Sequence, residues 1–183
     1  AFALRADGWY LRSDIIWHKP NPMPESVTDR PTKSHEYIFL FSKQPRYYYN
    51  AAAIAEASLF AGHIATSSVD DKSRDDSEVR TGKRWTGEVP PTRNKRTVWT
   101  VPTQSFPEAH FATYPEKLIE PCILAGSAIG DTVLDPFSGS GTTGVVAIGH
   151  QRNYIGCELN PEYAAMSRRR IGNVAPLLSQ EVA

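Results

Sequence analysis

Apolar residues near the start of the chain cluster in a way that predicts one helix end and two strands. Phe2, Leu4 and Trp9 stand at helical spacing, and Gly8 favours the end of that helix. The segments SDIIW and HEYIFLF are rich in β-branched and aromatic residues, which is typical of strands. Four prolines between them, in residues 18–34, exclude regular structure and predict a long loop.

The hydrophobic pattern disappears in the middle of the chain and then returns as strands alternating with helices. From about Glu56 to Asn94 the residues are mainly polar and charged, which we interpret as a mobile surface insertion. Beyond TVWTVP, the pattern predicts a helix in YPEKLIEPCILAGS, the strand DTVLDP, a helix at 142–150, the strand NYIGCEL and a final helix after the N-cap residue Asn160. This order forms a βαβα unit, whose two strands are expected to be parallel.

Charge narrows the classes of partner. The 183 residues include 20 basic and 20 acidic side chains, so the average charge favours neither a nucleic acid nor a membrane. One basic patch is local: between Arg80 and Arg96, six basic residues accompany one acidic residue and Trp85. Such a stretch suits phosphate contacts, and it suits a solvated loop equally well.

Cysteine and histidine spacing indicates no metal site. Cys122 and Cys157 lie in apolar stretches without CxxC spacing, so we expect reduced, buried thiols. The histidines show no metal-ligand spacing, and we assign no metal. No apolar run reaches the ~18 residues that a membrane span needs, so we expect no membrane partner.

A glycine-rich loop, DPFSGSGTTG, ends one predicted strand and opens the next helix. Gly139, Gly141 and Gly144 match G-x-G-x-x-G, which allows a dinucleotide-binding fold, whereas the lack of a following lysine excludes a P-loop. Asp135, just before the loop, would repel a pyrophosphate by ~4 kcal/mol at an effective dielectric constant of about 20. A ligand with a cationic end, such as S-adenosylmethionine, is therefore favoured. Glu158 ends the next strand, where a carboxylate can accept both ribose hydroxyls of either cofactor.

These motifs resemble those of the DNA methyltransferases that methylate the exocyclic amino group of adenine (N6) or cytosine (N4). DPFSGSGTT followed by YIGCELNPEY is similar to the family's cofactor motif, and HFATYPEKLIEPCI is similar to the segment that precedes it. IIWHKPNPMPESVTDRPTKSHEYIFLF resembles the catalytic-side segment of the circularly permuted, beta-type subgroup. The resemblance implies an α/β, Rossmann-like S-adenosylmethionine-dependent methyltransferase fold. Its mixed, mostly parallel sheet with a reversed strand would be incomplete in this carboxy-terminal part.

The resemblance also assigns site residues by position. Glu158 would hold the ribose, and the other cofactor-binding positions would be Phe111, Thr113, Tyr114, Pro115, Asp135, Pro136, Phe137, Ser138, Gly139, Ser140, Gly141, Thr142 and Thr143. The residues that match the flanks of a target-base pocket are Trp17, Lys19, Asn21, Pro22, Arg30, His35 and Glu36. From the basic patch, Arg93, Lys95 and Arg96 are added as DNA contacts. For His35, a histidine that only caps a strand start remains an alternative. Tyr47, Tyr48 and Tyr49 are more typical of sheet and core aromatics than of a base-stacking platform.

One part of the family pattern is missing. The family acts with an Asp/Asn/Ser-Pro-Pro-aromatic motif, which accepts hydrogen bonds from the target amino group. The one Pro-Pro pair of this chain, Pro90-Pro91, stands instead between Val89 and Thr92. In the permuted order the motif is expected upstream of Ala1. We therefore assign no catalytic residue in this chain. We expect it to be inactive alone, and either to self-associate or to form a marginally stable, rearranged fold.

The expected organisation has three segments. Residues 1–55 form a catalytic-side segment with a β-hairpin, 56–97 a polar, partly basic insertion that is a candidate DNA-contact region, and 98–183 the S-adenosylmethionine-binding βαβα half. The implied function is site-specific methylation of duplex DNA by a cytoplasmic, bacterial or phage-encoded enzyme, with a cognate restriction endonuclease as functional partner. Two alternatives remain open: a nicotinamide-dinucleotide-binding oxidoreductase domain, and a non-catalytic nucleic-acid-binding module.

Overall fold

The computed structural model describes residues 1–64, 87–104 and 113–174. These residues divide into two compact units, one formed by Ala1–Ile54 with Arg96–Ala183 and the other by Ala55–Lys95. Phe111 and the stretch from Arg80 to Trp85, which carry sequence-based predictions, lie outside the described residues.

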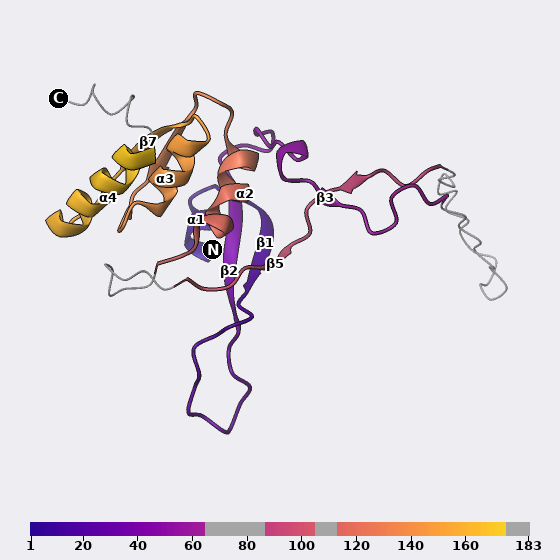
Figure 1. Cartoon of the computed structure of the whole chain (residues 1–183), viewed down its shortest axis with the longest axis horizontal. Coiled ribbons are helices and arrows are strands. Elements are labelled where there is room, and N and C mark those ends of the chain that lie inside the picture. Colours follow the sequence, from indigo (N-terminus) through magenta and orange to yellow (C-terminus); the bar gives the residue numbers. More distant parts are fainter. Residues whose placement is uncertain (65–86, 105–112, 175–183) are drawn as a thin grey trace. The chain divides into compact units, whose positions relative to one another are not determined.

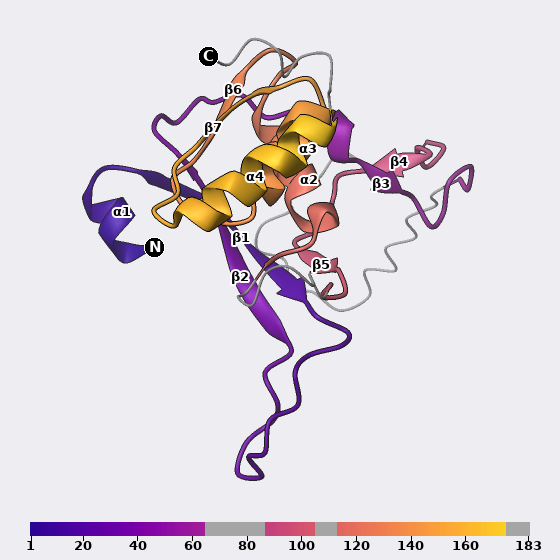
Figure 2. The same cartoon turned by 60° about the vertical axis from the view of Figure 1, so that its left-hand side comes forward.

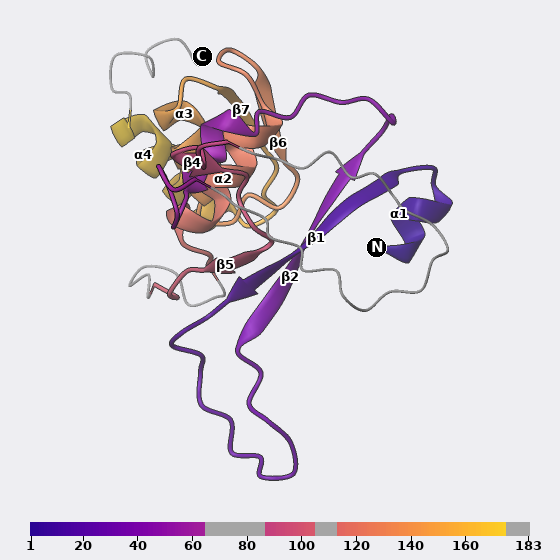
Figure 3. The ribbon, with the colours of Figure 1, turned by 90° about the vertical axis from the view of Figure 1, so that its right-hand side faces the viewer.

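The first unit contains a mixed sheet of three strands in the order β2-β1-β5 (Figure 1). The short helix α1 (Phe2–Ala6) precedes β1 (Tyr10–His18), which pairs antiparallel with β2 (His35–Ser42). On its other side β1 pairs parallel with β5 (Val98–Thr100). The two predicted strands, the proline-rich loop between them and the reversed strand are thus confirmed, and Figure 3 shows that loop extending beyond the ends of the hairpin.

The βαβα unit is also confirmed. β6 (Thr132–Asp135) and β7 (Asn153–Gly156) pair in parallel, as expected for a crossover connection. Asn160 caps the last helix, because its Oδ1 accepts a hydrogen bond from the backbone N–H of Glu162 at 2.9 Å. The helices of this unit are α3 (Thr142–Gly149) and α4 (Pro161–Val174), and the preceding helix is α2 (Glu116–Gly126). Helix α3 packs against both α2 and α4 (Figure 2).

Two clusters of buried side chains form the core of the first unit. Trp17, Trp99 and Leu118 make one cluster, and the other consists of Ile123, Val146 and Ala147. Helix α2 contributes to both, since Leu118 and Ile123 lie on its buried face. Helix α2 therefore links the three-stranded sheet to α3, which fixes the segment that precedes α2 beside the glycine-rich loop.

Several apolar side chains remain exposed. Two predictions of burial, one for Cys157 and one for the tyrosine run at 47–49, are therefore wrong. Cys157 is exposed because it follows the last residue of β7, where no described element covers it. The aromatic run formed by Tyr47, Tyr48 and Tyr49 lies outside the strands and is exposed, because β2 ends at Ser42. Arg12 lies over the exposed Tyr47 ring, 5.1 Å from its centroid.

The described part of the second unit is a short ribbon. β3 (Glu56–Ala57) pairs antiparallel with β4 (Thr92–Arg93), and Ile64 forms an isolated bridge with Glu88. The sequence pattern predicts no strand here, because two residues are too few to establish a periodicity. Within the described residues, no helix is both long and apolar enough to cross a bilayer.

Candidate cofactor site

The glycine-rich loop joins the end of β6 to the start of α3 and needs glycine for two separate reasons. Gly139 and Gly141 adopt positive φ angles of 52° and 79°, a region that disfavours side-chain-bearing residues. A Cβ at Gly141 would also lie 2.2 Å from Ser167 Oγ on α4. The backbone can make this tight turn and approach α4 closely only because these positions carry no side chain.

Asp135 is the last residue of β6, and neighbouring donors fix its carboxylate. The backbone N–H of Phe137 donates to Oδ1 at 3.0 Å, and the hydroxyl of Thr143 donates to Oδ2 at 2.6 Å. Tyr114 Oη lies 3.5 Å from the same Oδ2. These donors are neutral, so they orient the carboxylate and leave its negative charge available to a cationic ligand.

Tyr114 connects the segment before α2 to this carboxylate. Its hydroxyl lies 2.5 Å from Thr143 Oγ1, which in turn donates to Asp135. Burial is the main cause that raises the pKa of Tyr114 to about 12, and the nearby Asp135 carboxylate acts in the same direction. The hydroxyl therefore stays protonated at neutral pH and serves as a donor in this chain of hydrogen bonds.

Glu158 lies just beyond β7 and reaches back to the loop. Its Oε2 accepts a hydrogen bond from the N–H of Gly139 at 2.7 Å, and Oε1 accepts one from the N–H of Asn160 at 2.9 Å. The hydrogen bonds from Asn160 and Gly139 hold the pKa of Glu158 below its ordinary value of 4.5. Each carboxylate oxygen has a second lone pair, so Glu158 can bind the loop and still accept hydroxyl hydrogens from a ligand.

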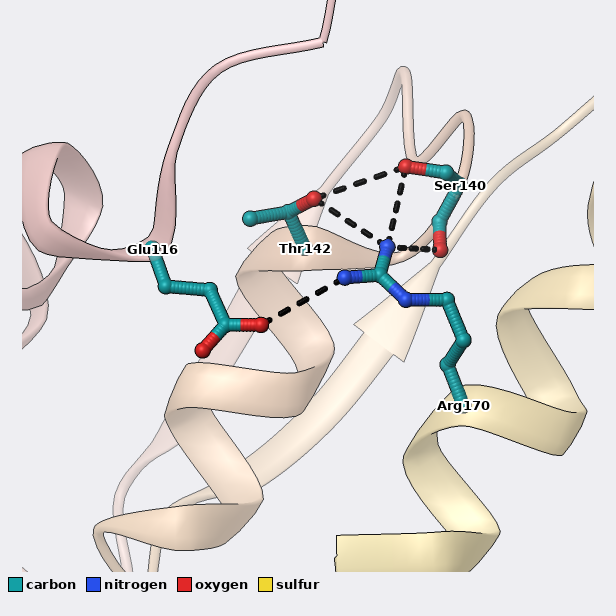
Figure 4. Close-up of polar contacts among 4 residues, drawn as sticks. All are labelled: Glu116, Ser140, Thr142 and Arg170. Atoms are coloured by element: carbon teal, nitrogen blue, oxygen red, sulfur yellow. Dashed lines mark hydrogen bonds and ion pairs between the residues drawn. The ribbon is translucent and has the colours of Figure 1, made fainter. Parts of the chain in front are cut away.

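A small cavity lies between the loop and the start of α2. Its volume is about 140 Å³, and its lining includes the described predicted residues Thr113, Tyr114, Pro115, Ser140 and Thr142. Arg170 of α4 also lines it, together with Glu116 and Gln104. Figure 4 shows Arg170 beside Glu116, Ser140 and Thr142. Sequence reasoning missed Arg170, because the run of arginines on α4 has no motif spacing. The contact arises only when α4 packs back on the loop.

The carboxyl ends of β1 and β5 carry part of the predicted DNA-side set. Trp17 is a core residue, and its indole N–H donates to the carbonyl of Val101 at 2.7 Å. Asn21 exchanges hydrogen bonds with Thr103, since its Oδ1 accepts from the Thr103 N–H at 2.9 Å. Both residues therefore hold the backbone in place, whatever further role they have.

Four other predicted residues share a larger cavity at the loop end of the β1–β2 hairpin. It has a volume of about 590 Å³ and is lined by Lys19, Pro22, Met23, Pro24, Glu25, Lys33, His35, Glu36 and Tyr37. Lys19 forms an ion pair with Glu36, and its ammonium lies 4.4 Å from the centre of the Trp17 ring. The His35 ring stands edge-on to Tyr37 at 5.3 Å, so this histidine both begins β2 and faces the cavity.

The remaining predicted cations lie elsewhere. Arg30 is exposed in the hairpin loop and pairs with Glu25 and Asp29 at 3.7 and 3.6 Å. Arg93, in the second unit, pairs with Glu56 at 3.0 Å. Lys95 ends the second unit and Arg96 begins the second segment of the first. Their roles as DNA contacts stay predictions, and the pairing of Arg93 with a carboxylate weakens its case as a phosphate ligand.

Comparisons with known proteins find a matching family and several relatives of this chain. A family model for DNA methylases of the N6/N4 class matches residues 1–169. The type II methyltransferase M.Cfr9I from Citrobacter freundii is 48% identical over 171 residues, which cover 93% of this chain and 47% of that protein. The type II methyltransferase M.SmaI from Serratia marcescens is 47% identical over 171 residues, covering 93% and 49%. The chain thus spans about half the length of the curated relatives it matches.

Solved structures show the same fold. The cytosine-N4-specific PvuII DNA methyltransferase gives a TM-score of 0.65 at 20% identity, covering 100% of this chain and 57% of that one. A putative DNA modification methylase from Thermus thermophilus, complexed with S-adenosyl-L-methionine, gives a TM-score of 0.56 at 26% identity, covering 96% and 59%.

Proposed function

Because the chain belongs to the N6/N4 DNA methylase family, we propose that it is part of a site-specific DNA methyltransferase that uses S-adenosylmethionine. The enzyme transfers a methyl group to the exocyclic amino group of adenine (N6) or cytosine (N4) in duplex DNA. Support comes from the type II methyltransferases to which the chain is similar and from the cofactor-bound Thermus relative. The same family membership disfavours the oxidoreductase that the glycine pattern alone allows.

The arrangement of Asp135 and Glu158 about the loop carries the proposal. Both carboxylates stand at the carboxyl ends of the paired strands β6 and β7, the edge where α/β sheets bind ligands. One is oriented by neutral donors and the other is tied to the N–H of Gly139. A nucleoside with a cationic sulfonium and ammonium fits this donor set, because one carboxylate can face the cation while the other accepts the ribose hydroxyls.

In this proposal each residue has a defined task. The bound cofactor supplies an electrophilic methyl group on a sulfonium. Asp135 places negative charge near the cationic end, and Tyr114 and Thr143 keep that carboxylate oriented. Glu158 orients the ribose and fixes Gly139 at the same time. Activation of the target amino group is assigned to the Pro-Pro-aromatic motif, which the 183 residues do not contain.

The DNA side is proposed for the cavity at the loop end of the hairpin, which Lys19, Lys33 and His35 line. An amino group inside a duplex is inaccessible to such a site, so the target nucleotide must leave the base stack. Lys19 is paired with Glu36, which orients its ammonium at the cavity wall. Further contacts with DNA phosphates are proposed for the basic patch that includes Lys95 and Arg96.

The first experiment compares Asp135→Asn with wild type in the intact protein. We expect S-adenosylmethionine to bind at least tenfold more weakly to the variant, because a charge-assisted contact is lost. S-adenosylhomocysteine, which lacks the sulfonium charge, should lose less affinity than S-adenosylmethionine. Isothermal titration calorimetry measures both. Asp14→Asn removes the same charge from the exposed strand surface and serves as the matched control.

Activity is tested with radiolabelled methyl transfer to duplex DNA, followed by identification of the methylated nucleoside. We expect N6-methyladenine or N4-methylcytosine. Preference for NAD over S-adenosylhomocysteine would revive the oxidoreductase alternative. DNA binding without any methyl transfer would favour the non-catalytic module instead.

A further inference from the structure

Arg170 lies on α4, outside the glycine-rich loop, yet it binds that loop at three oxygen atoms. Its Nη1 donates to the carbonyl of Ser140 at 2.7 Å, to Ser140 Oγ at 3.0 Å and to Thr142 Oγ1 at 3.3 Å. Its Nη2 points the other way, to Glu116 Oε1 at 3.4 Å (Figure 4). One side chain thus joins three elements: the end of the loop, the start of α3 and the start of α2.

The two sides that Arg170 joins are the two walls of the small cavity. Ser140 and Thr142 belong to one wall, while Thr113, Tyr114 and Pro115 belong to the other. Glu116 directly follows Pro115, which is the N-cap of α2. The contact between Arg170 and Glu116 therefore also restrains the segment that precedes α2. A ligand in this cavity contacts both walls, and its affinity depends on the spacing between them.

Helix stabilisation does not explain the position of this arginine. Thr142 is the first residue of α3, and a cation near a helix N-terminus interacts unfavourably with the helix dipole. A planar guanidinium with donors on two sides can bind the loop and Glu116 at once, whereas a lysine ammonium is a single point of attachment. The Arg170 side chain is also largely shielded, with 20% of it exposed, which reduces screening of these contacts by solvent.

We propose that Arg170 is a positioning residue for the methyl transfer. It holds the loop at a fixed distance from the segment Thr113–Pro115, and so sets the affinity for the cofactor. The inference rests on the proposed function, because it assigns the cofactor to this loop and segment. It adds a residue outside the motifs that carry the family resemblance.

The test uses S-adenosylhomocysteine and the intact protein. Arg170→Met keeps the aliphatic stem and removes all donors, and we expect at least tenfold weaker binding and a raised KM for S-adenosylmethionine with little change in kcat. Arg170→Lys keeps the charge but cannot span both walls, so it should recover less than a third of the lost affinity. Arg168→Met removes the same charge from an exposed position of the same helix and should change the affinity less than twofold.

Glu116→Gln tests the contact between Arg170 and Glu116. Its side chain is 54% exposed, so this variant folds without difficulty, and we expect a two- to threefold loss of affinity. In the Arg170→Met background the same change should have no further effect, because the partner is already lost. Hydrogen exchange should show that wild type, but not Arg170→Met, gains protection in the first turn of α2 when S-adenosylhomocysteine binds.

Distinct results overturn the inference and the proposed function. If wild type does not bind S-adenosylhomocysteine, the proposed function fails. If wild type binds, but Arg170→Met binds within twofold as tightly, or Arg170→Lys restores full affinity, the inference alone fails. If Arg170→Met does not fold, Glu116→Gln decides: unchanged affinity together with unchanged hydrogen exchange in the first turn of α2 overturns the inference.

Discussion

Glu158 binds the glycine-rich loop through its carboxylate, and in the proposed function the same carboxylate accepts the ribose hydroxyls of the cofactor. The hydrogen bonds from Asn160 and Gly139 stabilise the ionised form and lower the pKa of Glu158. A lowered pKa means that the carboxylate remains charged at every pH above that value. Its hold on the loop is lost only as the pH falls through the lowered pKa.

Replacement of Glu158 by glutamine tests this role. Gln retains one acceptor oxygen and loses the charge, so we expect S-adenosylhomocysteine to bind roughly tenfold more weakly. In wild type, Glu158 should cause no change in affinity between pH 8 and about pH 5, because it stays ionised throughout. Calorimetry across this pH range measures both effects. Glu162→Gln, an exposed change on α4, is the control, and equal affinities of the two variants would contradict the assignment.

At the scale of elements, the close packing of α3 on its neighbours depends on Gly144. A Cβ at this position would lie 2.4 Å from Ile171 Cδ1 and 2.7 Å from Tyr154 Cε1. Gly172, on α4, has no atom within 4 Å of such a Cβ. Both glycines thus have a helical backbone conformation, but the space around them differs.

Alanine at these two positions should change stability in opposite directions. Overpacking at Gly144→Ala costs typically ~1–3 kcal/mol, which exceeds the ~1 kcal/mol that alanine gains over glycine in a helix. Gly172→Ala receives only that gain. Urea denaturation of the intact protein should show a lower midpoint for Gly144→Ala and a higher one for Gly172→Ala. A raised midpoint for Gly144→Ala would show that α4 can move away from α3 at no cost.

The sequence predicts the long elements and the loop well, because these are encoded locally. The helix predicted at 142–150 is α3, Thr142–Gly149, and Asn160 caps α4 as expected. The pairing of β5 with β1 was not predicted, because three residues carry no period that names a distant partner. The contact of Arg170 with the loop was also missed, because the run of arginines on α4 has no motif spacing that indicates a partner. The hydrophobic pattern indicates which face of an element is buried, but it does not indicate which other element packs against that face.

At the scale of the whole molecule, the described strands form separate sheets with apolar side chains exposed. Among the residues that the structure describes, β6 and β7 pair only with each other, and Leu134 and Ile155 are exposed on them. β2 is the outer strand of its sheet and exposes Tyr37 and Phe39. Unpaired strand edges and exposed apolar faces favour association between chains.

We therefore predict that this 183-residue chain, produced alone, self-associates. Size-exclusion chromatography with light scattering should show a mass that increases with concentration. Replacing Leu134 and Ile155 by threonine keeps strand propensity, lowers apolar exposure and should reduce the association. Ile129→Thr, at an exposed position outside the strands, is the control. A monomer at all concentrations would contradict the prediction.

The parallel pairing of β1 with β5 joins residues far apart in the chain, since His18 and Thr100 are 82 positions apart. Forming this pair closes a long loop that contains the whole second unit, Ala55–Lys95. The entropy of closing a loop grows only with the logarithm of its length, so halving or doubling it changes the cost by about 0.6 kcal/mol. Insertions or deletions in the second unit, or its exchange, therefore change the free energy of folding of the first unit only slightly. Related chains can accumulate changes of length there while the first unit keeps its structure.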